Sequence, residues 1–154
     1  MSTEAAGSYP SELDVEWVAV DRVGRVAVFT TGGVGPIPRV YLDQPGILDC
    51  TREAVWAALE RTESVLLVSL PRPDDYEAFA RRGFFAFDWC DVHRTTGRSG
   101  LYEIQARPVA PAAFVEAAWP AELSVILVRL RNPLLDFAQP SVDVSVLDCV
   151  YGPV

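Results

Sequence analysis

The chain of 154 residues has no lysine, and all 13 of its basic residues are arginine. It therefore has no residue for a lysine Schiff base, and it lacks the lysine on which phosphate-binding loops rely. Basic residues are also outnumbered, because 21 acidic residues give a formal net charge of −8. A field of this sign repels phosphate backbones and attracts cationic surfaces. We therefore expect no nucleic-acid partner and favour a basic protein as the partner.

Histidine and cysteine are scarce, with one His and three Cys in the whole chain. Cys50, Cys90 and Cys149 are far apart and form no C-x-x-C pair, so neither a zinc knuckle nor a redox pair is predicted. We expect no metal and no cofactor. The N-terminal residues do not have a signal-peptide pattern, and the apolar runs near 65–70 and 125–130 are too short to cross a bilayer. We expect a cytoplasmic protein with free thiols and no membrane partner.

Apolar residues, in contrast, make up 50% of the chain, which is enough for one sizeable core. Residues 1–12 are small and polar, and we expect them to form a flexible N-terminal segment. No repeat or long linker divides the remainder. The prediction is a single domain over residues 13–154.

Short strand and helix patterns alternate along this domain without a regular βα rhythm. The runs 15–20 and 25–31 flank a glycine turn and predict a hairpin. Further strands are predicted at 39–42, 64–70, 84–88, 101–107, 123–130 and 142–146, and helices at 51–61, 74–82 and 111–118. Together these elements predict an α+β fold: a single mixed, mostly antiparallel sheet with two or three short helices packed on it.

Helix-end signals place two of these helices more closely. Thr51 is expected to cap the first helix, with Leu59 on its buried face. Asp74 and Glu77 have the spacing of a capping box for the second helix, and Gly83 is placed to end it.

The densest polar cluster is the run from Asp88 to His93. Asp91 and His93 project to the same side of an extended chain, so Asp91 could orient the imidazole as a general base, with Glu103 as a further catalytic candidate. Cys90 and His93 could alternatively approach a metal, although a closed site needs about four ligands. A strand end followed by a polar turn explains the same residues without any chemistry.

Two other features invite a functional interpretation. The glycine loop 30–36 lacks a lysine and is followed by prolines rather than a helix, which favours a wide turn over a phosphate site. Of the four tryptophans, Trp17 and Trp56 are predicted to lie in the core. Trp89 and Trp119 fall at element ends, where aromatic anchors for a partner often occur.

The stretch WVAVDRVGRVAVFTTGGVGPIP, residues 17–38, followed later by FAFDW at 85–89 and LYE at 101–103, carries a family resemblance. It resembles small uncharacterised bacterial proteins of the polymorphic-toxin immunity type. The resemblance implies a non-catalytic role in which the protein binds a partner, and it implies no catalytic residue.

The favoured hypothesis is a non-enzymatic, cytoplasmic protein-binding module for a basic partner, such as a toxin. Its predicted binding residues are acids that steer encounter and aromatics that anchor the partner: Glu12, Asp14, Glu16, Asp88, Trp89, Asp91 and Trp119. The alternative is a small enzyme or ligand-binding protein that uses the Asp91/His93 pair with Glu103. A homodimer with a purely structural role is a third hypothesis.

Overall fold

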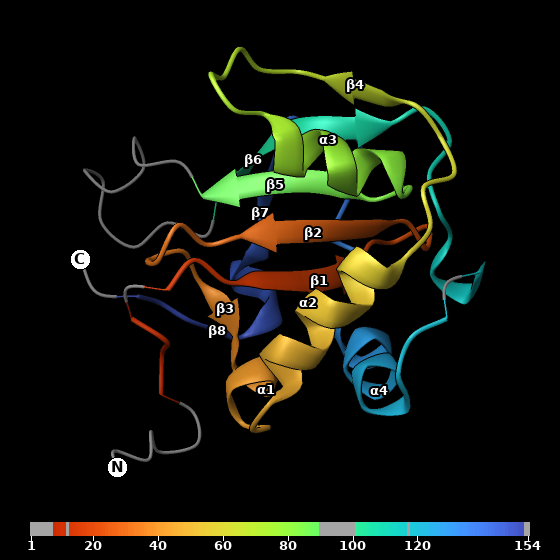
Figure 1. Ribbon diagram of the computed structural model, residues 1–154. Helices are drawn as coiled ribbons and strands as arrows, with labels where there is room; N and C mark the ends of the chain where they lie inside the picture. The colour runs from red at the N-terminus through yellow and green to blue at the C-terminus, as the bar shows by residue number, and fades with distance from the viewer. Residues whose placement is uncertain (1–7, 12, 90–100, 117, 153–154) are drawn as a thin grey trace.

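The computed structural model describes residues 8–11, 13–89, 101–116 and 118–152. Within these ranges, one six-stranded mixed sheet has the strand order β1-β2-β5-β6-β4, with β7 also paired to β6, and β3 and β8 form a separate two-stranded pair. The large sheet curls into a half-barrel with helices packed on it (Figure 1). This architecture confirms the predicted α+β fold. Most of the predicted flexible segment, residues 1–12, lies outside the described residues.

The first two strands form the hairpin that the sequence predicts. β1 (Glu16–Val20) pairs with β2 (Val26–Thr30) in antiparallel register, so that Glu16 lies opposite Thr30. Asp21 holds the turn, because its buried carboxylate accepts hydrogen bonds from two backbone amides of the turn. The hairpin thereby places the start of β1 beside the end of β2, at one end of the strands.

The other strands extend the sheet from β2. β5 (Phe85–Trp89) runs parallel to β2, and it pairs in antiparallel fashion with β6 (Leu101–Pro108). β4 (Ser64–Leu66) and β7 (Ser141–Asp143) each pair with β6 in antiparallel fashion. The described sheet is therefore mostly antiparallel, as predicted. The ends of β2 and β5 lie side by side, so the side chains at these ends are close together.

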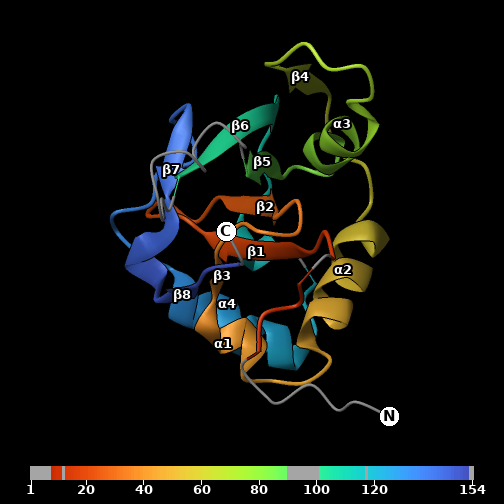
Figure 2. The ribbon, with the colours of Figure 1, turned by 90° about the vertical axis from the view of Figure 1, so that its left-hand side faces the viewer.

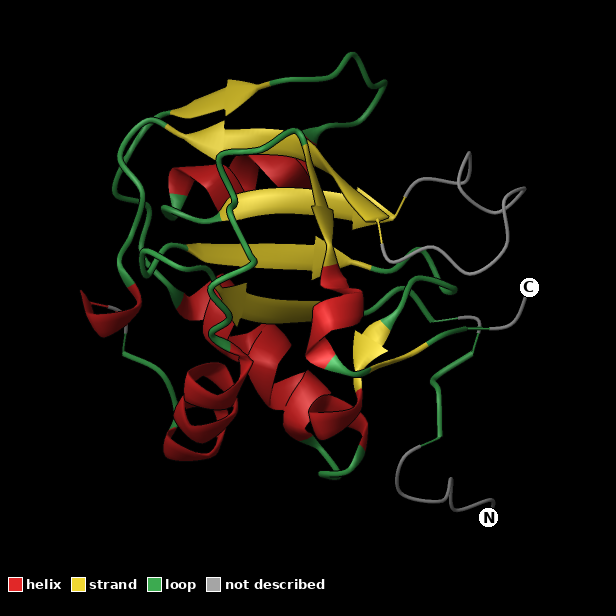
Figure 3. Ribbon diagram, turned by 180° about the vertical axis from the view of Figure 1, so that it is seen from behind, coloured by secondary structure: helices red, strands yellow, loops and turns green. Residues whose placement is uncertain are grey.

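Different segments cover the two faces of the sheet. α2 (Ile47–Ala57) and α3 (Asp74–Arg81) lie in front of it, and α4 (Ala121–Leu130) packs beside β1 (Figures 1 and 2). The C-terminal part of the chain crosses the opposite face (Figure 3). The remaining short elements are β3 (Ile37–Pro38), α1 (Arg39–Leu42), η2 (Phe114–Glu116), η3 (Val144–Leu147) and β8 (Cys149–Val150).

Aromatic side chains fill the space between the sheet and the C-terminal segment. Trp17 stacks on Phe29 with ring centroids 4.2 Å apart, and Phe29 stacks in turn on Phe87 at 5.3 Å. Phe137, from the C-terminal segment, meets Phe29 edge-on at 5.8 Å, and Tyr102 does so at 5.1 Å. All five side chains are buried. Burial of such rings is the main contribution to the stability of this face.

The outer edge of β1 is closed by a side chain. The hydroxyl of Tyr41, from α1, accepts a hydrogen bond from the Val18 amide at 3.1 Å and donates one to the Val18 carbonyl oxygen. Tyr41 is itself buried, so both backbone groups of this edge residue are satisfied away from water.

Two segments that were expected to be strands are helices. Residues 39–42 form α1 rather than an edge strand, and residues 123–130 belong to α4 rather than to a buried strand. α4 starts directly after Pro120, and its buried residues recur at helical spacing: Leu123, Ile126, Leu127 and Leu130. This spacing forms one apolar stripe on a helix. The continuous apolar run therefore reflects a helix that is also apolar on part of its outer face.

The other corrections concern element ends. α2 begins at Ile47 after Gly46, so Thr51 is not a cap; its hydroxyl donates to the Ile47 carbonyl inside the helix. Leu59 lies beyond the end of α2 and is 85% exposed instead of buried. α3 does begin at Asp74, but its N-cap is Pro73, without a side-chain hydrogen bond.

The predicted central strand 64–70 is also wrong. β4 covers only Ser64–Leu66, and it lies half-buried at the edge of the sheet. The last predicted strand, 142–146, is a strand only as far as Asp143, after which the chain turns into η3. In the predicted helix 111–118, the described helical residues are those of η2, a single 3-10 turn.

Candidate functional site

Four carboxylates gather where β2 and β5 end and β1 begins, at the left in Figure 1. We call this cluster of Asp14, Glu16, Asp75 and Asp88 the acidic edge. Asp14 precedes β1, Glu16 is its first residue, and Asp88 lies near the end of β5. Asp75, from the first turn of α3, adds the fourth charge. Three of these residues, Asp14, Glu16 and Asp88, are among those predicted from the sequence, and the fold brings the segment at the start of β1 beside the end of β5.

Asp88 is half-buried, and two side-chain hydrogen bonds hold its carboxylate in place. Its carboxylate accepts a bond of 2.6 Å from the Thr30 hydroxyl and a second from the Tyr76 hydroxyl. Burial raises the pKa of Asp88, and the charge of Asp14 raises it further, whereas the two hydrogen bonds oppose the shift. Burial and the same acidic neighbours raise the pKa of Tyr76, so this phenol remains a hydrogen-bond donor.

Glu16 repeats this pattern on β1, on the other side of β2 from Asp88. Its carboxylate accepts a hydrogen bond from the indole Nε1 of Trp56 at 3.1 Å. Burial raises the pKa of Glu16, and the charges of Asp75 and Asp14 add to the rise. The nearby guanidinium of Arg52 and the Trp56 bond work in the opposite direction. Two half-buried carboxylates at one sheet edge therefore both hold their charge at a cost in free energy.

Asp14 forms the exposed side of the acidic edge and connects it to the glycine loop. Its Oδ1 accepts a hydrogen bond from the Gly32 amide at 2.9 Å. The loop itself is a turn, in which the amides of Val34 and Gly35 donate to the Thr31 carbonyl. It leads into β3 rather than into a helix N-terminus, in agreement with the predicted wide turn.

The remaining predicted residues lie apart or outside the described chain. Glu103 in β6 lies directly opposite Asp88 in the sheet register and so borders the acidic edge. Trp89 is only 6% exposed and packs edge-on against Tyr102, so it does not offer the surface anchor that was expected. Trp119 is half-buried and stacks on Phe84, and neither of these residues belongs to the acidic edge.

Four predicted residues lie outside the described residues: Glu12, Cys90, Asp91 and His93. The Asp91/His93 enzyme hypothesis and the Cys90/His93 metal alternative therefore stay predictions. Within the described ranges, no group of three or more His, Cys, Asp or Glu side chains is arranged to hold a metal ion.

Sequence reasoning missed Asp75 and Tyr76. Both fall in the first turn of α3, where the sequence pattern indicates only the start of a helix. Their position above the ends of β2 and β5 depends on how α3 packs, which no local pattern encodes. Thr30 and Asp88 give the better signal, since each is a polar residue at or next to the end of an apolar strand.

Comparison with protein-family models, curated proteins and solved structures finds no match to this chain. In the part of the chain that the structure describes, no helix combines the length and apolar character needed to cross a membrane.

Proposed function

We propose that this protein is a non-enzymatic protein-binding module that recognises a basic partner through the acidic edge. One observation carries the proposal: the fold gathers Asp14, Glu16, Asp75 and Asp88 at one end of the sheet, where burial and neighbouring acids raise the pKa of both Glu16 and Asp88. The approach of a cation lowers the free energy of such crowded, half-buried carboxylates, because the cation offsets their mutual repulsion and replaces lost hydration. A lysine or arginine side chain of a partner supplies such a cation.

The surroundings of the acidic edge suit a partner surface. Asp14 and Asp75 are exposed and extend the negative potential outward, which accelerates the encounter with a basic protein. Tyr76 is half-buried beside Asp88 and supplies an aromatic side chain of the kind that often anchors interfaces. It takes the role that the sequence had assigned to Trp89.

The finer form of the proposal is an immunity-type role in the cytoplasm, with a basic toxin as the partner. The resemblance of residues 17–38 to immunity-type proteins and the net charge of −8 support it. The free thiols of Cys50 and Cys149 fit a reducing compartment.

The proposal is tested with a fluorescent nona-arginine peptide, its neutral nona-citrulline analogue and two variants of equal net charge. Asp14→Asn with Asp75→Asn neutralises the exposed part of the acidic edge and leaves an acceptor for the Gly32 amide. Glu63→Gln with Asp43→Asn removes two exposed acids outside that cluster. Anisotropy titrations at several salt concentrations give the affinities, and stopped-flow mixing gives the association rates.

We expect binding that weakens with salt, and little affinity for the citrulline peptide. The edge variant should lose about thirtyfold in affinity, since each of the two exposed charges contributes on the order of 1 kcal/mol. Most of this loss should be in slower association. Equal losses in the two variants would show that net charge alone attracts the peptide, and the acidic edge would then not be the site.

A further inference from the structure

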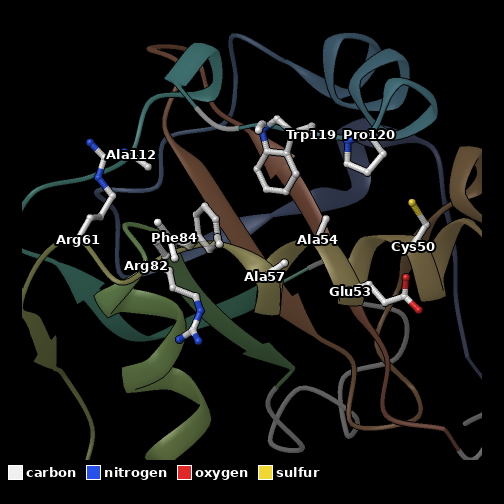
Figure 4. A pocket seen from close by; sticks show the side chains of 13 residues that line it. Cys50, Glu53, Ala54, Ala57, Arg61, Arg82, Phe84, Ala112, Trp119 and Pro120 are labelled. Carbon is white, nitrogen blue, oxygen red and sulfur yellow. The ribbon is translucent and has the colours of Figure 1, made fainter.

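A second feature lies on the other side of Trp56. A pocket of about 800 Å³ opens between α2 and the residues Ala112 and Ala118, Trp119 and Pro120 (Figure 4). Small-molecule sites typically have volumes of ~300–1,000 Å³ and mostly apolar walls. None of the residues of the acidic edge lines this pocket.

The walls of the pocket are apolar and of two kinds. On one side α2 and the residue after it present Ala54, Ala57 and Ala58, whose spacing puts three small side chains on neighbouring positions of the helix surface. On the other side Phe84 and Trp119 stack with ring centroids 5.7 Å apart and an interplanar angle of 29°. The space between a flat aromatic wall and an alanine face suits a flat or slim apolar group.

The far wall is fixed by a close crossing of two chain segments. Gly83 has φ +92°, and its carbonyl accepts a hydrogen bond from the Ala112 amide at 2.9 Å. A Cβ at Gly83 would lie 2.8 Å from Ala112, so the two backbones are in direct contact. This crossing holds Phe84 in place, and a preformed wall lowers the entropy lost when a ligand binds.

Charge is distributed unevenly along the pocket. Arg61 and Arg82 lie at one end and Glu53 at the other, with the aromatic and alanine walls between them (Figure 4). The Arg82 guanidinium lies over the Trp56 ring at 5.1 Å, and the Glu60 carboxylate is 3.8 Å from it. Two guanidinium groups and one carboxylate thus line the pocket, and Glu60 pairs with the Arg82 guanidinium from outside the lining.

Two lining side chains also hold buried donors. The Nε of Arg82 and the Nε1 of Trp119 have no hydrogen-bond acceptor among the described residues. Native proteins leave few such donors unsatisfied. Both atoms are buried from water as the side chains stand, so the preference for an anionic ligand over a pure hydrocarbon rests on the guanidinium groups at one end of the pocket.

From these observations we propose that the pocket binds a small monocarboxylate with a flat apolar body, of the aryl carboxylate type. The carboxylate lies toward Arg61 and Arg82, and the apolar body lies between Ala57 and the Phe84–Trp119 pair. This site goes beyond the proposed function and is independent of it, since it uses none of the residues of the acidic edge.

The test uses three probes of the same shape: 2-naphthoate, neutral 2-naphthamide and cationic 2-naphthylmethylammonium. Binding is followed by NMR from the amide shifts of Ala54, Ala57 and Ala112. Ala57→Leu fills the pocket from an exposed helix position that accepts leucine well. Ala138→Leu makes the same change at an exposed alanine that does not line the pocket. Arg61→Gln removes one positive charge from the lining.

We expect 2-naphthoate to bind with a Kd below about 1 mM and at least about tenfold more tightly than the other two probes. Ala57→Leu should weaken binding at least tenfold, Ala138→Leu should leave it unchanged, and Arg61→Gln should reduce the preference for the anion. Equal affinities for the three probes, unchanged binding in Ala57→Leu, or no shifts at several millimolar would each overturn the proposal. The nona-arginine titration is expected to be the same in Ala57→Leu, so failure of one proposal is distinguishable from failure of the other.

Discussion

The acidic edge and the pocket are neighbours, joined by Trp56, and they are built in opposite ways. Trp56 donates to Glu16 on one side, and its ring lies under Arg82 on the other. The acidic edge consists of polar side chains that hydrogen bonds hold at strand ends. The pocket results from small residues on α2 facing a wall that a backbone crossing fixes. Single side chains therefore determine the first region, whereas backbone packing determines the second.

The largest expected effect comes from breaking the backbone crossing. Gly83→Ala places a methyl group 2.8 Å from the Ala112 backbone at a φ of +92°. We expect a loss of about 3 kcal/mol in the free energy of unfolding, from left-handed strain and overpacking together. Urea denaturation measures it.

Gly46→Ala is the matched control, since Gly46 has φ +79° but no atom within 4 Å of its would-be Cβ. This variant should lose only about 1 kcal/mol, the strain alone. Similar losses at both glycines would mean that the crossing at Ala112 is not tightly packed.

A smaller contrast concerns two thiols. Burial raises the pKa of Cys149 to about 12, and its thiol donates to the Val144 carbonyl. Burial and the charges of Glu122 and Glu53 also raise the pKa of Cys50, but this thiol lines the open pocket. Because the thiolate is the reactive form, iodoacetamide at pH 8 should alkylate Cys50 at least about tenfold faster than Cys149.

Peptide mass spectrometry over a time course measures both rates in one sample. Denaturant should remove the difference between the two cysteines. Faster reaction at Cys149 in the folded protein would mean that the pocket is closed to small molecules.

The smallest expected effect is at the acidic edge. The folded-state pKa of Asp88 is raised, so its protonated form favours folding; this stability is present below the unfolded pKa and is lost as pH rises through the folded pKa. Asp88→Asn cannot ionise and keeps an oxygen for the Thr30 hydroxyl. We expect its Tm to exceed that of the parent by about 2–4 °C at pH 7.

The difference in Tm should shrink as the pH falls through the raised pKa of Asp88, because its own carboxyl group is then protonated. Thermal melts between pH 4 and pH 7 measure the trend. A lower Tm for the variant at pH 7 would show that the charge of Asp88 stabilises the fold, contrary to the effect of burial.

Much of the sheet could be predicted from the sequence because the information is local. Alternating residues around a glycine turn specify the hairpin of β1 and β2, and the strands at 85–89 and 101–108 follow the predicted runs closely. The strand prediction fails at α4 because a continuous apolar run fits a buried strand as well as a helix, whereas Pro120 and the spacing of Leu123, Ile126 and Leu130 indicate the helix.

The two functional regions also differ in how far the sequence alone predicts them. Asp14, Glu16 and Asp88 could be picked out because charged residues beside apolar strands are visible in the sequence. The pocket could not, because Ala57 and Gly83 become meaningful only when α2 and the segment after Ala112 lie side by side. Such contacts between distant segments leave no local pattern.

The hydroxyl of Tyr41 has a consequence for assembly. Because it occupies both the amide and the carbonyl of Val18, an incoming strand from another molecule finds no free ladder position there. One phenolic oxygen thus discourages fibrillar stacking and strand exchange on that side. Among the described strands of this sheet, growth from chain to chain is then left to β4 and β7, the short strands on its other side.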